Sequence, residues 1–441
     1  MRNKMDSINI IGAGLAGSEA AWQIAKRGFK VRLYEMRPNV MTPAHHTSKF
    51  AELVCSNSLK ADTLDSASGL LKHELRLLDS LIISNAEKTK IPAGGALAVD
   101  REAFSESITE KLLGLTNIEI IRNEVVNIDD REITIVATGP LTSKKLSEQL
   151  QLITDQKFLY FYDAAAPLIE ADSIDDSKVF WASRYGKGTA DYLNCAMSKE
   201  EYDRFYSALI NAETQPLKEF EKQKTFEGCM PIEVIAKRGY KTMLFGPLRP
   251  VGLHSEAIDA NKPYAIVQLR RDNAAKTLFN MVGFQTNLKW KEQKNVFRLI
   301  PGLEKAEFAR FGVMHRNTFI NSPKILLPTK QLKLRRNILI AGQLSGVEGY
   351  MESTASGLLA GINAVRIISG EEPLIMPRNT AFGSLMHYIT NADPDDFQPA
   401  NINFGLLPEW PKELKDKREK KLCIANRAIE SMIEFINKHK L

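Results

Sequence analysis

The stretch Gly12-Ala13-Gly14-Leu15-Ala16-Gly17 decides the fold of this chain. It follows a short apolar run, Ser7 to Ile11, and begins a segment in which apolar residues recur with helical spacing. A second apolar run, Lys30 to Tyr34, ends at Glu35, 18 residues after the last glycine of the stretch. Such a turn lets the backbone approach a pyrophosphate at a helix N-terminus, and the later acid accepts hydrogen bonds from a ribose. We therefore predict a strand–helix–strand unit that binds a dinucleotide, rather than a glycine turn that serves packing alone.

Two later segments bear on which nucleotide is bound, because the glycine turn alone does not separate NAD, FAD and S-adenosylmethionine. A strand ends in Ala137-Thr138-Gly139, and a strand, turn and helix begin with Ile340-Ala341-Gly342-Gln343. These segments resemble the second and third sequence marks of FAD-binding flavoproteins. In those proteins the third mark reaches the pyrophosphate and the ribityl chain. The three marks together predict FAD.

The sequence pattern changes between about residues 160 and 310, where aromatic residues are frequent and no further strand–helix–strand signature appears. We predict an α/β fold: a Rossmann-like FAD-binding domain with a doubly wound parallel sheet, interrupted by an inserted α+β domain. The predicted parts are residues 1–160, an inserted substrate or RNA domain at 161–310, and 311–441 with a terminal helix. Helical spacing predicts helices over Asp65 to Leu81, Arg101 to Leu113, Ser353 to Ile368 and about Lys412 to Ile436.

The composition, with 44% hydrophobic and 25% charged residues in 441, is typical of a globular protein. No apolar run approaches the roughly 20 residues that cross a bilayer, and the N-terminus lacks a signal-peptide pattern. We expect a cytoplasmic protein without a membrane partner. The net charge of +6 permits binding to a polyanion without requiring it.

Four cysteines, Cys55, Cys195, Cys229 and Cys423, form no CxxC pair, which disfavours a metal site or a disulfide framework. A glycine before Cys229 and a proline shortly after it predict a loop that can present a thiol to a cleft. From the residues alone, Cys55 and Cys229 are either catalytic thiols or small buried side chains.

The sequence resembles the FAD- and folate-dependent tRNA (uracil-5-)-methyltransferases, the TrmFO family, which is related to the GidA flavoproteins. The resemblance covers nearly the whole chain, and FEGCMP and MHRNTFINSP are its most specific motifs. The matching segments are GAGLAGSEAAW, LYEMRP, TPAHHT, FAELVCSNSLKA, PAGGALAVDR, ATGPLTS, FYDAAAP, FEGCMPIEV, FGPLRPVGL, GVMHRNTFINSP, GVEGYMESTASGLLAGINA and NFGLLP.

The resemblance implies methylation of uridine C5 in RNA, at the T-loop uridine at position 54 of tRNA. It implies FAD as cofactor, with methylenetetrahydrofolate as the carbon donor and NADPH or NADH as the reductant. Cys229 is implied as the nucleophile that adds to uracil C6 and so activates C5. Cys55 is implied to guard the carbon unit on the flavin and to take part in removing the C5 proton.

Further residues follow from the same resemblance. His315 matches a histidine that packs against the folate pterin ring, with a hydrogen-bonded core histidine as the competing interpretation. Tyr350 matches an active-site tyrosine. Arg37 and Arg101 are candidates for contacts with the cofactor or with a folate carboxylate.

Three alternatives remain open from the sequence. The same chemistry can serve a uridine of 23S ribosomal RNA, because the motifs do not encode the RNA scaffold. Enzymes that build aminomethyl groups on the wobble uridine share the glycine turn, but they carry an additional C-terminal helical domain for which we expect 441 residues to leave no room. A non-catalytic flavin-containing RNA-binding protein is the alternative of another class, and it would not need two thiols.

Overall fold

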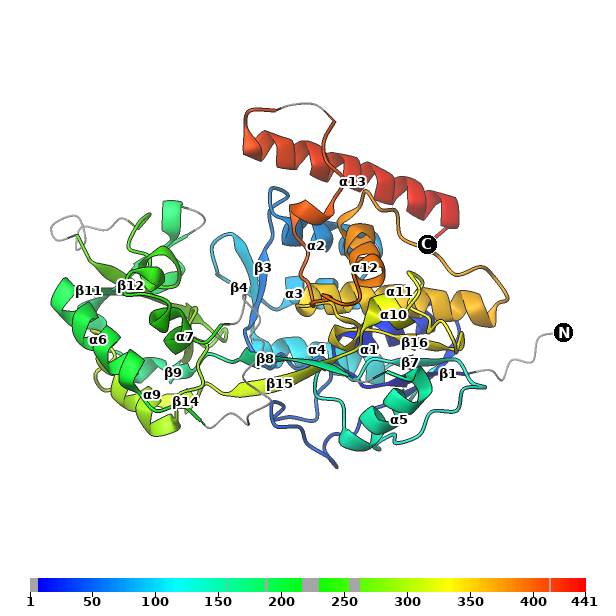
Figure 1. The fold of residues 1–441 in the computed structure, drawn as a ribbon, viewed down its shortest axis with the longest axis horizontal. Helices are drawn as coiled ribbons and strands as arrows, with labels where there is room; N and C mark the ends of the chain where they lie inside the picture. The colour runs from blue at the N-terminus through cyan, green and yellow to red at the C-terminus, as the bar shows by residue number, and fades with distance from the viewer. Residues whose placement is uncertain (1–6, 157, 187–188, 216–229, 254–261, 412–413) are drawn as a thin grey trace.

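The computed structural model describes residues 7–156, 158–186, 189–215, 230–253, 262–411 and 414–441. Two lobes lie side by side, and a ribbon of two antiparallel strands, β8 (Leu159–Ala164) and β15 (Met314–Phe319), runs between them (Figure 1). One lobe contains a parallel sheet, and the other contains an antiparallel sheet built from the middle of the chain. The predicted α/β fold with an inserted α+β unit is therefore confirmed, whereas the exact boundaries at residues 160 and 310 remain predictions.

The parallel sheet is organised around β1, which contains the apolar run before the glycine turn. Strand β1 pairs in parallel with β2 on one side and with β7 on the other, and its register sets Ile10 opposite Leu33 and Ile135. All three side chains are fully buried because both faces of a doubly wound sheet are covered. The strand order is β16 (Ile338–Ile340), β7 (Thr134–Val136), β1 (Ser7–Ile11), β2 (Lys30–Tyr34), β6 (Ile118–Ile121).

Helices α1 (Leu15–Ala25) and α11 (Tyr350–Ile368) pack against each other at backbone distance. A Cβ atom added to Gly357 of α11 would lie 2.1 Å from the carbonyl oxygen of Ala16 in α1. One added to Gly361 would lie 2.9 Å from the Ala20 carbonyl oxygen. The small residues of α11 therefore bring the third predicted flavin mark beside the first.

The predicted helix over Asp65 to Leu81 is wrong in its extent. The chain forms α2 (Ala67–Leu77) and then α3 (Leu81–Lys88), separated at Asp79, which has a φ of 54°. A left-handed residue ends a helix, and the Ser80 side chain begins the next one by accepting the Ile83 N–H. The helix α4 (Arg101–Leu113) has its predicted bounds, and α13 (Lys417–His439) begins five residues later than predicted.

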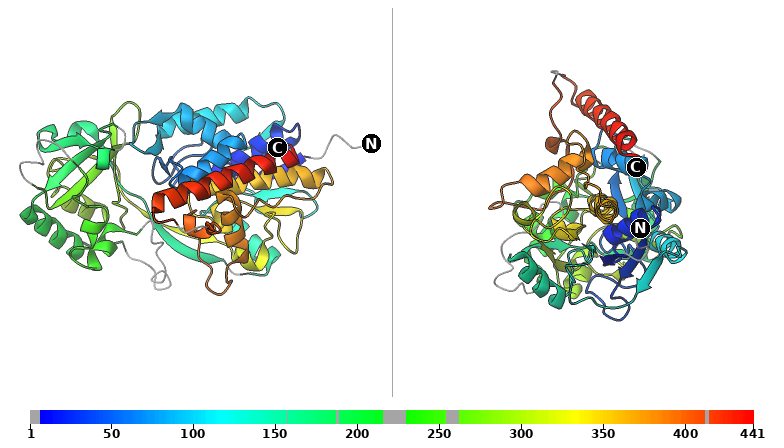
Figure 2. Two further views of the ribbon diagram at one scale, coloured as in Figure 1. Left: turned by 90° about the horizontal axis from the view of Figure 1, so that it is seen from above. Right: turned by 90° about the vertical axis from the view of Figure 1, so that its right-hand side faces the viewer.

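Further elements complete the parallel-sheet lobe. Helix α13 lies across its outside (Figure 2) and packs against α2 through Ala425, Ala428 and neighbouring apolar residues. The others are the small sheet β3 (Ser58–Ala61), β5 (Ala96–Val99) and β4 (Lys90–Ile91), with helices α5 (Lys144–Thr154), α10 (Ser322–Ile325) and α12 (Ala381–Asn391).

The second lobe has its own core between an antiparallel sheet and three helices. Alternate residues of β11 and β12, among them Cys195 and Val267, pack against Phe205 of α6 and Phe297 of α9. The strand order is β10 (Val179–Ala182), β11 (Tyr192–Met197), β12 (Ala265–Arg271), β13 (Leu278–Met281), β9 (Leu168–Glu170), β14 (Phe308–Arg310). The helices are α6 (Lys199–Asn211), α7 (Ile232–Lys237) and α9 (Trp290–Phe297).

None of the helices in the described residues is long and apolar enough to span a bilayer. Within the same residues, no group of three or more His, Cys, Asp or Glu side chains is placed to hold a metal ion.

Candidate active site

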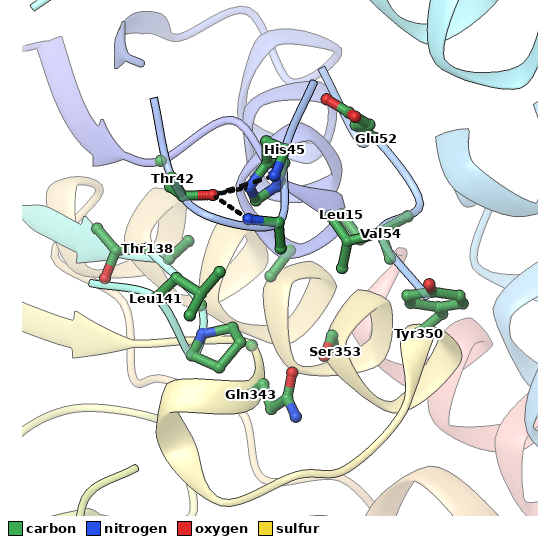
Figure 3. Close-up of a pocket in the computed structure, with 18 of the residues that line it drawn as sticks. Leu15, Thr42, His45, Glu52, Val54, Thr138, Leu141, Gln343, Tyr350 and Ser353 are labelled. Carbon is green, nitrogen blue, oxygen red and sulfur yellow. Dashed lines mark hydrogen bonds between the residues drawn. The ribbon is translucent and has the colours of Figure 1, made fainter. Parts of the chain in front are cut away.

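A cavity of about 380 Å³ opens where β1, β2 and β7 end, at the carboxyl edge of the parallel sheet (Figure 3). This edge is where open α/β sheets bind their ligands. The wall of the cavity contains the glycine turn, Glu35 and Arg37, residues 42, 44 and 45, the segment around Cys55, residues 137–143, Gly342 and Gln343, and the start of α11. The three predicted flavin marks therefore lie around one cavity.

The three glycines of the turn are required for different physical reasons. A Cβ atom at Gly17 would lie 1.8 Å from the Gly12 carbonyl oxygen, and one at Gly12 would lie 2.7 Å from the Ala137 carbonyl oxygen. The fold itself therefore excludes a side chain at both positions. A Cβ atom at Gly14 meets no atom of the described residues within 4 Å, although Gly14 lines the cavity. The space at Gly14 is thus open to a ligand that approaches the backbone.

Two helices begin at this cavity. The N-cap of α1 is Gly14 and that of α11 is Gly349, and within the described chain no side chain caps either helix. Leu15 of α1 and Ser353 of α11 face the same hollow in Figure 3. Uncapped N–H groups and the positive ends of two helix dipoles suit a bound pyrophosphate. The residues present therefore fit the phosphate part of FAD.

Glu35 and Arg37, both predicted to contact the cofactor, form a buried ion-pair network. Arg37 Nε lies 2.9 Å from Glu35 Oε1, and Arg37 Nη1 lies 3.0 Å from Glu52 Oε2. Glu35 Oε2 also accepts the backbone N–H of Ala13 at 3.0 Å, which ties β2 to the glycine turn. Burial acts to raise the pKa of Glu35, but the hydrogen bonds and charge of Arg37 outweigh it, and the pKa is lowered. The contacts of both residues with a cofactor stay predictions.

His45 is a residue of the cavity wall that sequence reasoning missed. Its Nδ1 lies 2.6 Å from the hydroxyl of Thr42, which also accepts the backbone N–H groups of Ala44 and His45 (Figure 3). Burial, together with the positive charge of Arg37, lowers the pKa of His45 to about 4. The imidazole is therefore neutral at physiological pH. The threonine three residues before the histidine in TPAHHT is the local signal for this turn.

Cys55 lines the same cavity as the glycine turn, and its backbone is held from three sides. Its N–H donates to the Tyr350 hydroxyl oxygen at 2.9 Å. Its carbonyl oxygen accepts hydrogen bonds of 3.1 Å from Arg101 and 3.1 Å from Arg310. Tyr350 is the first residue of α11, so the predicted active-site tyrosine and the predicted thiol are brought together.

Arg101 links the Cys55 segment to the antiparallel-sheet lobe. Its guanidinium donates to Asp272 at 2.9 and 3.0 Å, to the Cys55 carbonyl and to the Leu53 carbonyl. Burial acts to lower the pKa of Arg101, but the Asp272 carboxylate outweighs it and raises the pKa. Each nitrogen of the guanidinium thus has a protein partner, and the predicted contact with a folate carboxylate stays a prediction.

A second arginine joins the lobes beside this pair. Arg270 of β12 donates to the Ser56 hydroxyl at 2.7 Å and to the Asn57 side-chain oxygen at 3.1 Å. The Asn57 side chain in turn donates to the Arg271 carbonyl at 3.0 Å. The residues that follow Cys55 are therefore fixed against the end of β12.

The second and third marks each contain a glycine with a positive φ, and this backbone conformation favours glycine over other residues. Gly139 has a φ of 68° and Gly342 a φ of 73°, a conformation that side chains rarely adopt. The Gln343 side chain donates to Glu348 at 2.6 Å and so braces the turn between β16 and α11. All three residues line the cavity, while their contacts with FAD stay predictions.

The remaining predicted residues are placed less completely. Cys229 lies outside the described residues. His315 lies on β15, opposite Asp163 of β8, and its side chain is also outside the description. Cys195 is fully buried in the core of the second lobe, and burial raises its pKa to about 12. An inert structural role for Cys195 is consistent with that burial.

Comparisons with known proteins place this geometry in a family. A family model described as GIDA, glucose inhibited division protein A, matches residues 7–372. The methylenetetrahydrofolate--tRNA-(uracil-5-)-methyltransferase TrmFO of Brevibacillus brevis is 61% identical over 429 residues, which cover 97% of this chain and 98% of that protein. The TrmFO of Bacillus subtilis is 60% identical over 432 residues, covering 98% and 99%. The chain belongs to the TrmFO family.

The TrmFO relatives match along both lobes, since the alignments leave only 2–3% of the chain uncovered. Among solved structures, Aquifex aeolicus GidA superposes with a TM-score of 0.70 at 16% identity, covering 98% of this chain and 73% of that one. This likeness shows the fold alone. The GIDA family model, which matches residues 7–372, confirms the predicted relation to the GidA flavoproteins.

Proposed function

We propose that this protein transfers the one-carbon unit of methylenetetrahydrofolate to C5 of a uridine in tRNA, the reaction for which its TrmFO relatives are named. One observation carries the proposal beyond family membership. The cavity that opens at the glycine turn is also lined by the Cys55 segment, so a cofactor bound there would lie beside a cysteine.

FAD is the proposed cofactor of the cavity. FAD would supply electrons, which come from NADPH or NADH, and the site of one-carbon transfer. The N-terminal ends of α1 and α11 would hold the pyrophosphate of FAD. The open space at Gly14 would let this pyrophosphate approach the backbone. Gly139, Gly342 and Gln343 line the same cavity and would hold the rest of the dinucleotide.

Cys55 is proposed to accept the C5 proton. Its backbone is fixed by Tyr350, Arg101 and Arg310, so the thiol is held in place before substrate arrives. The two guanidinium groups also set positive charge beside the thiol. Nearby positive charge favours the thiolate, which is the form of cysteine that can accept a proton, and fixed geometry holds it in place.

Cys229 is proposed to add to uracil C6. The chain after it supports this role, because Ile232 donates its backbone N–H at 2.7 Å to the carbonyl of Gln285, which lines the cavity. Ile232 is three positions after Cys229 in the chain. Two thiols then divide the work, one activating the ring and the other removing the proton.

The substrate and setting are further proposals. The T-loop uridine at position 54 of tRNA is the proposed target, with a uridine of 23S ribosomal RNA as the alternative outcome. We also propose that His315 contacts the pterin ring of the folate and that the protein is located in the cytoplasm. His45 is proposed to be neutral in the working enzyme.

Cysteine variants test the proposed function. The purified protein is incubated with tRNA transcript, methylenetetrahydrofolate, FAD and NADPH, and 5-methyluridine is measured by mass spectrometry. Cys229→Ala should abolish the product while retaining FAD, and Cys195→Ala should retain both as the matched control. Wild-type protein that binds FAD and RNA but forms no 5-methyluridine in tRNA or ribosomal RNA would favour the non-catalytic alternative. A Cys229→Ala protein with normal activity would remove the proposed nucleophile.

A further inference from the structure

The antiparallel sheet of the second lobe is only partly covered by its helices. On its core face, Cys195 and Val267 are fully buried beneath α6 and α9. Toward the end of the sheet nearest Cys55, the same face continues with Trp181, Leu193 and Phe279, and there Trp181 is 41% exposed. An indole at the end of a core face is therefore open to solvent.

A pocket of about 420 Å³ lies at this open end. The Arg271 guanidinium stacks over the Trp181 ring at 4.5 Å, and the ring of Phe279 lies 6.0 Å from that of Trp181. Lys276 lines the pocket from the turn between β12 and β13, and Asp176 lines it from the opposite rim. The pocket thus combines an exposed aromatic surface with two cations and one carboxylate.

Arg271 has donor capacity that the protein does not use. Its Nε is buried, and among the described residues it has no hydrogen-bond partner. A buried polar group without a partner is uncommon in a folded protein. A phosphate is a ligand that matches the fork of donors on a guanidinium.

The pocket is adjacent to the candidate active site. The Arg271 carbonyl accepts the hydrogen bond from Asn57, two residues after Cys55. The next residue, Asp272, pairs with Arg101, which holds the Cys55 carbonyl. The open end of the sheet is therefore tied directly to the Cys55 segment, within reach of a polymer strand whose reacting base enters the cavity.

We propose that Trp181, Arg271 and Lys276 form a second nucleotide site, which holds an unreacted nucleotide of the substrate RNA. Its base stacks on the exposed indole, and its phosphate binds Arg271 and Lys276. Stacking on aromatic side chains accepts any base, and phosphate contacts fix the register of the strand. The inference rests on the proposed function, because it takes the RNA substrate from there.

Equilibrium binding of a fluorescein-labelled T-arm RNA hairpin to the full-length, FAD-loaded protein tests the site. Trp181→Ala should weaken binding by about 5- to 100-fold, the range expected for one stacked base, and Trp181→Phe should weaken it less. Arg271→Gln should also lower the salt dependence of binding by about one phosphate contact. Flavin absorbance confirms that each variant retains its cofactor.

The same lobe supplies matched controls. Trp290 is 60% exposed and stacks on Phe311 at 5.5 Å, and Lys294 lies 5.7 Å from the centre of the Phe311 ring. Trp290→Ala and Lys294→Ala therefore remove an exposed indole and a ring-bound cation from the same lobe, outside the pocket. Neither should change RNA affinity measurably, because neither residue lines the pocket.

Three outcomes would overturn the inference. The first is unchanged RNA affinity in Trp181→Ala while the wild-type protein methylates the hairpin, which leaves the proposed function intact. The second is an Arg271→Gln protein that binds RNA normally but has a raised KM for NADPH in flavin reduction. That result would assign the pocket to the reductant. The third is wild-type protein that neither binds nor methylates the hairpin or ribosomal RNA, which would remove the proposed function as well.

Discussion

The hydroxyl oxygen of Tyr350 accepts a hydrogen bond of 2.9 Å from the backbone N–H of Cys55, a residue 295 positions earlier in the chain. This contact joins the first residue of α11, whose start faces the cavity, to the segment that presents the thiol. The part of the cavity proposed to bind the pyrophosphate and the proposed proton acceptor are thus connected through one side chain.

Tyr350→Phe removes the acceptor for the Cys55 N–H and should lower the methylation rate about five- to tenfold, corresponding to roughly 1 kcal/mol of lost positioning. FAD content should be unchanged. Tyr388→Phe is the control, because Tyr388 donates to the Gln398 carbonyl away from the cavity. Equal rates for both variants would show that the Tyr350 contact does not position Cys55.

The glycines of the turn should separate folding from ligand binding. Gly17→Ala sets a Cβ atom against the Gly12 carbonyl and should destabilise the apoprotein by about 3 kcal/mol or more. Gly14→Ala should leave the melting temperature of the apoprotein within a few degrees of wild type but weaken FAD binding at least tenfold. Calorimetry of apoprotein and FAD titration measure the two effects. Normal FAD affinity in Gly14→Ala would refute the proposed approach of the pyrophosphate.

The Arg101–Asp272 pair should respond to single and double substitution differently. Arg101→Met leaves Asp272 buried without its partner and should cost about 3–5 kcal/mol of unfolding free energy. Adding Asp272→Leu should restore much of that stability. Methylation should stay low in the double variant, because the Cys55 carbonyl has still lost a donor. Full recovery of activity together with stability would assign Arg101 a purely structural role.

Lys330 should make stability depend on pH. The side chain is fully buried, it donates to the Ser345 hydroxyl at 2.8 Å, and burial lowers its pKa to about 7. Between pH 7 and about 10.4 the unfolded chain binds more protons at this residue than the folded one, so stability should rise with pH across that window.

Chemical unfolding of Lys330→Met measures this effect. The variant should gain most over wild type below pH 7, and its advantage should shrink toward pH 10. Lys333→Met is the control, because Lys333 is an exposed residue whereas Lys330 is fully buried. A pH-independent difference between Lys330→Met and wild type would show that Lys330 stays protonated in the fold.

The fold was predictable where the signal is local. The turn at Gly12 to Gly17 and the glycines at 139 and 342 occupy positions that their immediate neighbours or a positive φ require, so the sequence indicates them directly. The break between α2 and α3 was missed because Asp79 adopts a left-handed conformation without being glycine.

The site was only partly predictable because its ties are long-range. Arg101 and Asp272 are 171 residues apart, and nothing in either segment marks the other as its partner. The exposure of Trp181 was also not predictable, because the sequence shows it only as one of many aromatic residues in the middle of the chain. The Thr42–His45 turn, in contrast, is local and was available from TPAHHT.

Isotope tracing tests the central claim most directly. The wild-type protein is given tRNA transcript, NADPH and methylenetetrahydrofolate labelled with ¹³C in the methylene group, and the RNA is digested for mass spectrometry. We expect ¹³C in the methyl group of 5-methyluridine at the T-loop uridine, with none in the Cys229→Ala reaction. Labelled product in the Cys229→Ala reaction, or 5-methyluridine that carries no label, would contradict it.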